Sequence, residues 1–280
     1  MNDSRRGVLY PDRLPEFHRL PAGPEIAHAV RWFWIPEWRL DEGEASRQEL
    51  LAFPACNLVA SPDAVIVSGP TTRRSERVLT GTGWAVGALL RPAAVPALQI
   101  DPTGIRDAER PLREPALLAE IVRAMTVGGT AGVTGGSGFA DPDDARRTAA
   151  ASALGDWIAA RVPVPEAHAE AGLANRLADA LADSAIRRAD QLPDRLHASL
   201  RTLQRIAARY FGLSLHSMIR RRRLQEGAER LRDDPGLTIA ALASELGYAD
   251  HAHFTTDFRA QLGFAPSVYR AKAEPGAPAD

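Results

Sequence analysis

The sequence predicts a multidomain α+β protein: a β-rich N-terminal barrel or sandwich with flanking helices, followed by an all-helical C-terminal region. From about residue 17 to residue 110, short β-prone runs such as HAVRWFW, NLVA and AVIVSG alternate with Pro and Gly. From residue 189 onward, apolar residues recur every three or four positions, as in amphipathic helices. A Gly-rich stretch at residues 128–143 lies between the two patterns, and its composition predicts a flexible loop.

Length and composition allow two hydrophobic cores, because the chain has 280 residues of which 45% are hydrophobic. No apolar run approaches the roughly 20 residues that span a bilayer, and the N-terminal MNDSRRG leads into no signal-peptide hydrophobic region. A single cysteine, Cys56, excludes an intrachain disulfide. These features predict a soluble cytoplasmic protein that does not interact with membranes.

Residues 1–127 are predicted to form the β-rich unit, with a role in effector binding or oligomerisation. Its most distinctive feature is the aromatic run Trp32, Phe33 and Trp34. Successive side chains of a strand point to opposite faces, so Trp32 and Trp34 share one face. We expect this face to line a pocket for an apolar or aromatic small molecule. The alternative is that these aromatic residues form core or an interface.

Three helices are expected between the strands and the C-terminal region. The segment ERPLREPALLAEIVRAM predicts the first, and residues 144–162 and 166–188 predict the other two within a helical linker at residues 144–188. The helix at 144–162 places Ala150, Leu154, Trp157 and Ile158 on one face. That face suits either packing on the β-rich unit or self-association in a homodimer.

The pattern from residue 238 to residue 263, called module two, is typical of a helix-turn-helix. Thr238 can cap a first helix, TIAALASEL, and Gly247 ends it. Asp250 can cap a second helix from His251 to Leu262. The inward side of the second helix is formed by Phe254, Phe258 and Leu262, and its free side by His251, Ala252, Thr255, Thr256 and Arg259. A capped helix with one free face after a tight turn predicts a DNA-reading element.

The same pattern occurs 51 residues earlier, at residues 187–212, called module one. Ser199 aligns with Asp250, and Gly212 aligns with Gly263. Residues 215–231 between the modules can form one helix of roughly 26 Å, at about 1.5 Å per residue. One turn of DNA is about 34 Å, so both free helix faces would reach successive major-groove segments of a double-stranded operator.

Charge is uneven along the chain, although the total is near neutral with 34 basic and 35 acidic residues. Residues 190–273 contain 13 basic and 9 acidic residues, and the stretch from Arg195 to Gln225 contains eight arginines and no acid. This stretch predicts phosphate contact, with Arg220 and Arg221 as candidate ligands. The alternative is a solvated helix face in which Arg222 or Arg223 pairs with Glu226.

Residues 190–272 resemble the AraC/XylS family of bacterial transcription regulators. The residues that match the family pattern in module two are Ile239, Leu242, Ala243, Gly247, Tyr248, Asp250, Phe254, Phe258, Arg259, Gly263, Pro266, Tyr269 and Arg270. Two departures are Ala265, where Ser or Thr is usual, and His197, where module one usually has glycine. With Pro193 close by, the second departure predicts a shortened first helix in module one.

The resemblance implies a DNA-binding domain, which we expect at residues 189–273, and we expect a disordered tail at 274–280. It implies base reading by the residues two, five and six positions after each helix cap. These are Arg201, Gln204 and Arg205 in module one, and Ala252, Thr255 and Thr256, with His251 beside them, in module two. Gln suits adenine and Arg suits guanine, whereas the short side chains of module two suit thymine methyls. It further implies a small-molecule sensor domain, cupin-like in arrangement, and RNA polymerase as a candidate partner.

No enzyme, cofactor or metal site is predicted. His251 and His253 point about 200° apart on a helix, so joint metal ligation is not expected. The sequence contains no P-loop, dinucleotide glycine fingerprint or nucleophile elbow. Two alternatives to an effector-responsive regulator stay open. One is an enzyme, thiol sensor or methyl acceptor using Cys56, and the other is a ligand-free regulator controlled by a protein partner.

Overall fold

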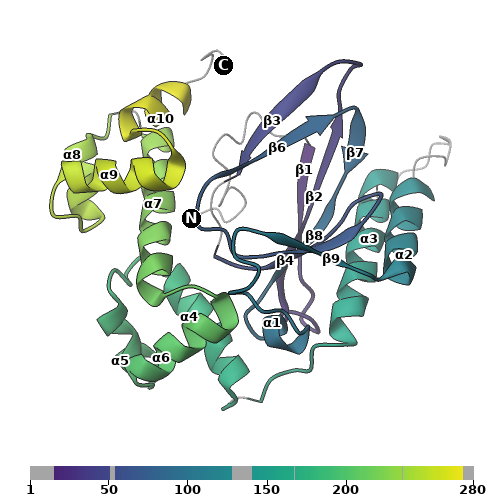
Figure 1. The fold of residues 1–280 in the computed structure, drawn as a ribbon, viewed down its shortest axis with the longest axis horizontal. Helices are drawn as coiled ribbons and strands as arrows, with labels where there is room; N and C mark the ends of the chain where they lie inside the picture. The colour runs from purple at the N-terminus through teal and green to yellow at the C-terminus, as the bar shows by residue number, and fades with distance from the viewer. Residues whose placement is uncertain (1–15, 51–53, 128–140, 167, 235, 274–280) are drawn as a thin grey trace.

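The structure, a computed structural model, describes residues 16–50, 54–127, 141–166, 168–234 and 236–273. The predicted tail at 274–280 and most of the predicted Gly-rich loop at 128–143 lie outside these residues. The described strands all lie between residues 16 and 112, and helices predominate in the rest of the described chain, as the sequence predicts (Figure 1).

Within the described residues, seven strands form one antiparallel sheet in the order β1-β2-β8-β4-β5-β9, and β7 pairs with the end of β2. A separate two-stranded sheet contains β3 and β6. The bounds are β1 Glu16–Pro21, β2 Val30–Arg39, β3 Ala45–Leu50, β4 Asn57–Ala60, β5 Val65–Ser68, β6 Ser75–Thr80, β7 Thr82–Trp84, β8 Val86–Leu90 and β9 Glu109–Leu112. The predicted β-rich architecture is confirmed.

The core of this half lies between the sheet and two helices, α2 (Pro115–Val127) and α3 (Pro142–Ala159). Every residue of the central strand β8 is buried, so both faces of the sheet are covered at this strand. Ala150, Leu154 and Ile158 of α3 are buried in the same cluster as Phe33 of β2. The apolar face of α3 therefore packs on the sheet, the first of its two expected roles.

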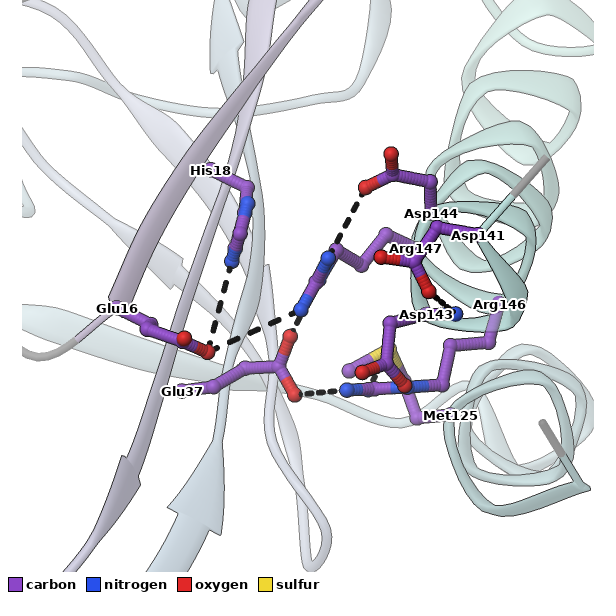
Figure 2. A network of polar contacts seen from close by, with 9 residues as sticks. All are labelled: Glu16, His18, Glu37, Met125, Asp141, Asp143, Asp144, Arg146 and Arg147. Carbon is purple, nitrogen blue, oxygen red and sulfur yellow. Dashed lines mark hydrogen bonds and ion pairs between the residues drawn. The ribbon is translucent and has the colours of Figure 1, made fainter. Parts of the chain in front are cut away.

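A group of ion pairs fixes the start of α3 against β2 (Figure 2). Glu37 on β2 accepts from Arg147 Nε at 2.6 Å and from Arg146 Nη2 at 2.5 Å. Burial alone would raise the pKa of Glu37, but the hydrogen bonds from the two arginines outweigh this effect and lower it. Because the side chain of Arg147 is only 6% exposed, removing Glu37 would leave a buried charge that only the exposed carboxylates of Asp144 and Glu16 still contact.

The helix expected over ERPLREPALLAEIVRAM is wrong for its first six residues. Residues 109–112 form β9, which pairs with β5, and α2 begins only at Pro115. Proline has no N–H to donate and is tolerated in the first turn of a helix, so Pro115 suits the start of α2. The expected helix at 166–188 is also shorter, because α4 spans Glu170–Ala182.

The C-terminal half contains two hydrophobic clusters joined by one long helix. Its elements are α4, the 3₁₀ turn η4 (Ala189–Gln191), α5 (Leu192–Leu196), α6 (Leu200–Ile206), the π-helical turn η5 (Ala207–Phe211), α7 (Leu215–Asp233), α8 (Ile239–Glu245), α9 (His251–Leu262) and α10 (Pro266–Ala273). Leu215 and Met218 at the start of α7 belong to the first cluster, and Leu224 and Leu231 belong to the second. A short helix, α1 (Ala94–Ala97), contacts η5 from the β-rich side.

Candidate nucleic-acid interface

Module two has the geometry that its sequence predicts. Thr238 accepts from the backbone N–H of Ala241 at 3.1 Å and caps α8. Gly247 then adopts a φ of +76°, a left-handed conformation that costs glycine little. Asp250 accepts from the backbone N–H of His253 at 2.7 Å, which caps α9 and lowers the pKa of the Asp250 carboxyl.

An aromatic core orients α9. Phe254 and Phe258 are fully buried with ring centroids 5.4 Å apart, and Phe258 lies 5.8 Å from Tyr269 of α10. These rings fix the inward side of the helix. On the outward side, His251, Ala252, Thr256 and Arg259 are exposed and Thr255 is half-buried. The structure thus brings the five candidate residues of module two onto one helix, with Thr255 less accessible than the others.

Module one follows the same plan with a shorter first helix. The helix α5 has five residues and ends at His197, which adopts a φ of +52° at the position where glycine is usual. Ser199 accepts from the backbone N–H of Thr202 at 3.1 Å and caps α6. Arg201, Gln204 and Arg205 are exposed on α6. Leu203, Ile206 and Ala207 are buried on its opposite side.

The end of module one touches the β-rich half closely. Gly212 adopts a φ of +65°, and a Cβ at this position would lie 2.5 Å from the carbonyl oxygen of Pro102. The Gly212 carbonyl accepts from Arg106 Nε at 3.1 Å and Nη2 at 2.6 Å. Glycine permits both the positive φ and the close approach of the two backbones.

The arginine cluster on α7 does not form one phosphate-binding surface. Arg220 pairs with Asp257 at 2.7 Å, and Arg221 is 3% exposed and donates to the Thr71 carbonyl. Arg222 pairs with Glu226 at 2.9 Å, and Arg223 lies 4.1 Å from the Tyr248 ring centroid. Successive helical residues are about 100° apart, so four in a row point to all sides of α7.

Arg221 faces the β-rich half, away from solvent. Burial lowers the pKa of Arg221 to about 10, while Asp107 partly offsets this effect. Arg220, with a side chain 35% exposed, is the more accessible of the two candidate phosphate ligands.

One acidic residue that no sequence motif indicated contacts the recognition helix of module one, which consists of α6 and the turn η5 that continues it. Glu170, at the start of α4, pairs with Arg205 Nη1 at 2.6 Å and with Arg209 Nη1 at 3.0 Å. Burial and the charge of Glu170 raise the pKa of Tyr210 beside it. Glu170 lies 35 positions before Arg205, and no motif in the sequence joins the two.

A cavity of about 140 Å³, called the junction cavity, lies between the β-rich half and the helices. Trp32 and Cys56 line it from the sheet side, and Leu181, Phe211 and Met218 line it from α4, η5 and α7. Two arginines also contact the Trp32 ring, with the Cζ atom of Arg19 at 4.4 Å and that of Arg31 at 4.9 Å from its centroid.

Trp34 lies elsewhere, although it shares a strand face with Trp32. It stacks on Phe17, donates to Asn57 Oδ1 at 3.1 Å and covers Gly87. The structure therefore separates the two tryptophans that the sequence analysis grouped in one pocket.

Cys56 is 2% exposed, and burial raises the pKa of its thiol to about 12. A buried neutral thiol is a poor nucleophile, which argues against a reactive thiol. Within the part of the chain that the structure describes, no three His, Cys, Asp or Glu side chains gather closely enough to hold a metal ion. In the same residues, no helix is both long and apolar enough to cross a bilayer.

Comparison with known protein families gives two matches. The model of a helix-turn-helix domain matches residues 192–272, and that of a domain of unknown function, DUF6597, matches residues 18–105. The HTH-type transcriptional activator RhaS of Escherichia fergusonii is 33% identical over 81 residues. RhaS of Pectobacterium carotovorum is 34% identical over 82 residues.

Residues 192–272 form an AraC-type helix-turn-helix domain. The resemblance inferred from the residues is confirmed for this segment. The alignment with each RhaS covers 29% of this chain and 29% of the relative, so the chain spans under a third of the curated relatives it matches.

Solved structures are also similar to this chain. The crystal structure of ToxT from Vibrio cholerae aligns over 88% of this chain and 99% of its own, with 12% identity and a TM-score of 0.39. The C-terminal domain of AraT from Geobacillus stearothermophilus aligns over 40% of this chain and 90% of its own, with 22% identity and a TM-score of 0.32.

Proposed function

We propose that this protein is a sequence-specific DNA-binding transcription regulator whose N-terminal half responds to a small-molecule effector. One observation carries the proposal: α6 and α9 each present an exposed face, and the single helix α7 joins the two modules. With 19 residues, α7 is about 28 Å long at 1.5 Å per residue. This length suits binding to successive major-groove segments on one side of double-stranded DNA.

Module one is proposed to provide most of the direct base reading. Arg201, Gln204 and Arg205 have long side chains with several donors, which pair bidentately with guanine or adenine edges. The exposed residues of module two are short or apolar apart from His251 and Arg259, and Thr255 is half-buried. Arg220 is proposed to contact phosphate, whereas the buried position of Arg221 favours a role in holding the two halves together.

The junction cavity is the proposed effector site. Its walls combine Trp32, Leu181 and Phe211 with charged side chains such as Arg91 and Asp179 at its edge. Such a lining favours a small, largely apolar molecule that carries a polar group. The cavity is smaller than the roughly 300–1,000 Å³ of typical ligand pockets. A larger effector would require α4 to move away from the sheet.

Further partners follow from the proposed role. An activator would contact RNA polymerase, and the regulator would act in the cytoplasm, where its DNA is found. A homodimer would use another surface than Ala150, Leu154 and Ile158, because these residues are buried against the sheet.

Selection of DNA by the full chain from a random duplex library tests the DNA-binding proposal. Enrichment of a defined sequence supports it, and failure to enrich any sequence contradicts it. For the effector, we expect compounds from a thermal-shift library to stabilise the wild-type chain. Ala178→Phe, which fills the cavity, should abolish that shift. Ala159→Phe, on the exposed end of α3, should leave it unchanged.

A further inference from the structure

Glu170 occupies the arginines that module one would present to DNA. Its two carboxylate oxygens are divided between Arg205, at 2.6 Å, and Arg209, at 3.0 Å. The two arginines are four residues apart and therefore lie on the same side of the helix. One carboxylate thus neutralises part of the positive charge of the recognition helix.

The contact competes chemically with DNA. A guanine edge or a phosphate oxygen accepts from the same guanidinium N–H groups that the Glu170 carboxylate engages. The side chain of Glu170 is 25% exposed, and those of Arg205 and Arg209 are 58% exposed. The arginine side chains are therefore accessible to a competing anion, which a buried pair would not be.

The helix that begins with Glu170 contacts both the β-rich half and module one. Glu170 begins α4, and Asn175 in the same helix accepts from the Ala93 backbone N–H at 3.0 Å and donates to the His28 carbonyl at 2.7 Å. Asp179 pairs with Arg91 at 2.6 Å. The following turn of α4 lines the junction cavity. On the other side, Leu177 and Leu181 of the same helix are buried with Leu203 in the core of module one, so Glu170 is held beside the arginines that it pairs with.

We propose that Glu170 is an autoinhibitory residue that competes with DNA for Arg205 and Arg209. The form in which Glu170 pairs with both arginines binds DNA weakly, and rotation of the Glu170 side chain away from them frees the two arginines for DNA. The inference rests on the proposed DNA-binding function.

The test compares Glu170→Gln with Glu166→Gln in the full-length chain. Glu166 is exposed four residues earlier, so its substitution changes the net charge equally at a nearby position. The probe is a duplex that the wild-type chain selects from a random library, and the dissociation constant is measured by fluorescence anisotropy. We expect Glu170→Gln to bind about 3- to 10-fold more tightly than wild type. Glu166→Gln should change binding less than about 2-fold, because exposed charges act weakly at a distance.

A second pair of variants shows whether Glu170 acts through the arginines. In an Arg205→Ala, Arg209→Ala background, Glu170→Gln should no longer tighten binding.

Equal tightening by the Glu166 and Glu170 substitutions would mean that only the net charge matters and would overturn the proposal. Weaker binding by Glu170→Gln would overturn it as well, since Glu170 would then be positioning Arg205 for DNA. Circular dichroism verifies folding, and Glu170→Ala repeats the test if Glu170→Gln is unfolded. A wild-type chain that selects no DNA overturns the proposed function together with this inference.

Discussion

Arg205 combines a predicted base-reading position with an observed intramolecular ion pair. We expect Arg205→Ala to weaken binding to the selected duplex by about 1–3 kcal/mol and to relax preference at one or two bases. Binding to non-specific DNA should weaken less. The measurement is titration of base-substituted duplexes at several salt concentrations.

One outcome would contradict the assignment of Arg205 to base reading. Equal losses on the selected duplex and on random DNA would mean that Arg205 contacts only phosphate. Gln204 is the matched neighbour: its exposed amide carries no charge, so Gln204→Ala should change base preference with little effect on the salt dependence.

For single residues, local sequence signals were sufficient to predict helix caps. They did not predict contacts between residues that are far apart in the chain. The helix caps Thr238, Ser199 and Asp250 accept the hydrogen bonds that their sequence positions predict. Arg221, by contrast, meets Thr71, which lies 150 residues away in the chain. A run of arginines shows that positive charge is concentrated, but only the tertiary fold determines which of them remain exposed.

The ion pairs of Glu37 attach helix α3 to strand β2, and we expect their loss to lower the stability of the protein. Glu37→Gln leaves Arg146 and Arg147 side by side without their shared carboxylate. Because the Glu37 side chain is 16% exposed, we expect a loss of about 2–3 kcal/mol, below the roughly 3–5 kcal/mol of a fully buried pair. Urea unfolding measures the change, with Asp144→Asn, at the exposed edge of the network, as the milder control. Equal effects of the two substitutions would contradict a special role for Glu37.

The ion pairs of Glu37 also predict how the stability of the protein depends on pH. The pKa of Glu37 is lower in the folded protein than its ordinary value of 4.5. Its contribution to stability is therefore complete above that value and is lost as pH falls through the lowered pKa. Glu37→Gln should remove this part of the acid dependence.

Elements were predictable where periodicity was long and where proline or glycine marked their ends. The helices α8 and α9 match the expected spans closely, whereas residues 109–112 became a strand. Four residues are too few for periodicity to separate strand from helix, and pairing with β5 decides the outcome. The π-helical turn at residues 207–211 also has no sequence signal that distinguishes it from the α-helix expected there.

For the molecule as a whole, the first cluster of the C-terminal half extends beyond the proposed boundary at residue 189. Ala174, Leu177 and Leu181 of α4 are buried in that cluster with Leu203 and Ile206. We expect a fragment of residues 165–273 to unfold cooperatively and at a higher temperature than a fragment of residues 189–273. Thermal unfolding followed by circular dichroism compares the two. Equal midpoints would show that α4 is dispensable and would support the boundary at 189.

The contacts between the two halves could not be predicted from the sequence either, because they join residues that are far apart in the chain. They join Arg106 to Gly212 and Ala93 to Asn175, pairs that are 106 and 82 residues apart. These contacts depend on how the β-rich half packs against the helical half. Hydrophobic periodicity describes each half alone and gives no information about the packing between them.

The continuous helix α7 also limits which operators the protein can use. Its first turns belong to the core of module one and its last turns to that of module two, so the distance between the modules is fixed. Inserting five base pairs between the two half-sites would rotate one of them to the opposite side of the duplex, since a helical turn has about 10–10.5 base pairs. A flexible tether would recover binding when ten base pairs are inserted, whereas a rigid connection would not. We therefore expect both insertions to reduce binding to the level of an isolated half-site, as measured by gel shift, so that regulatory sites for this protein tolerate no variation in half-site spacing.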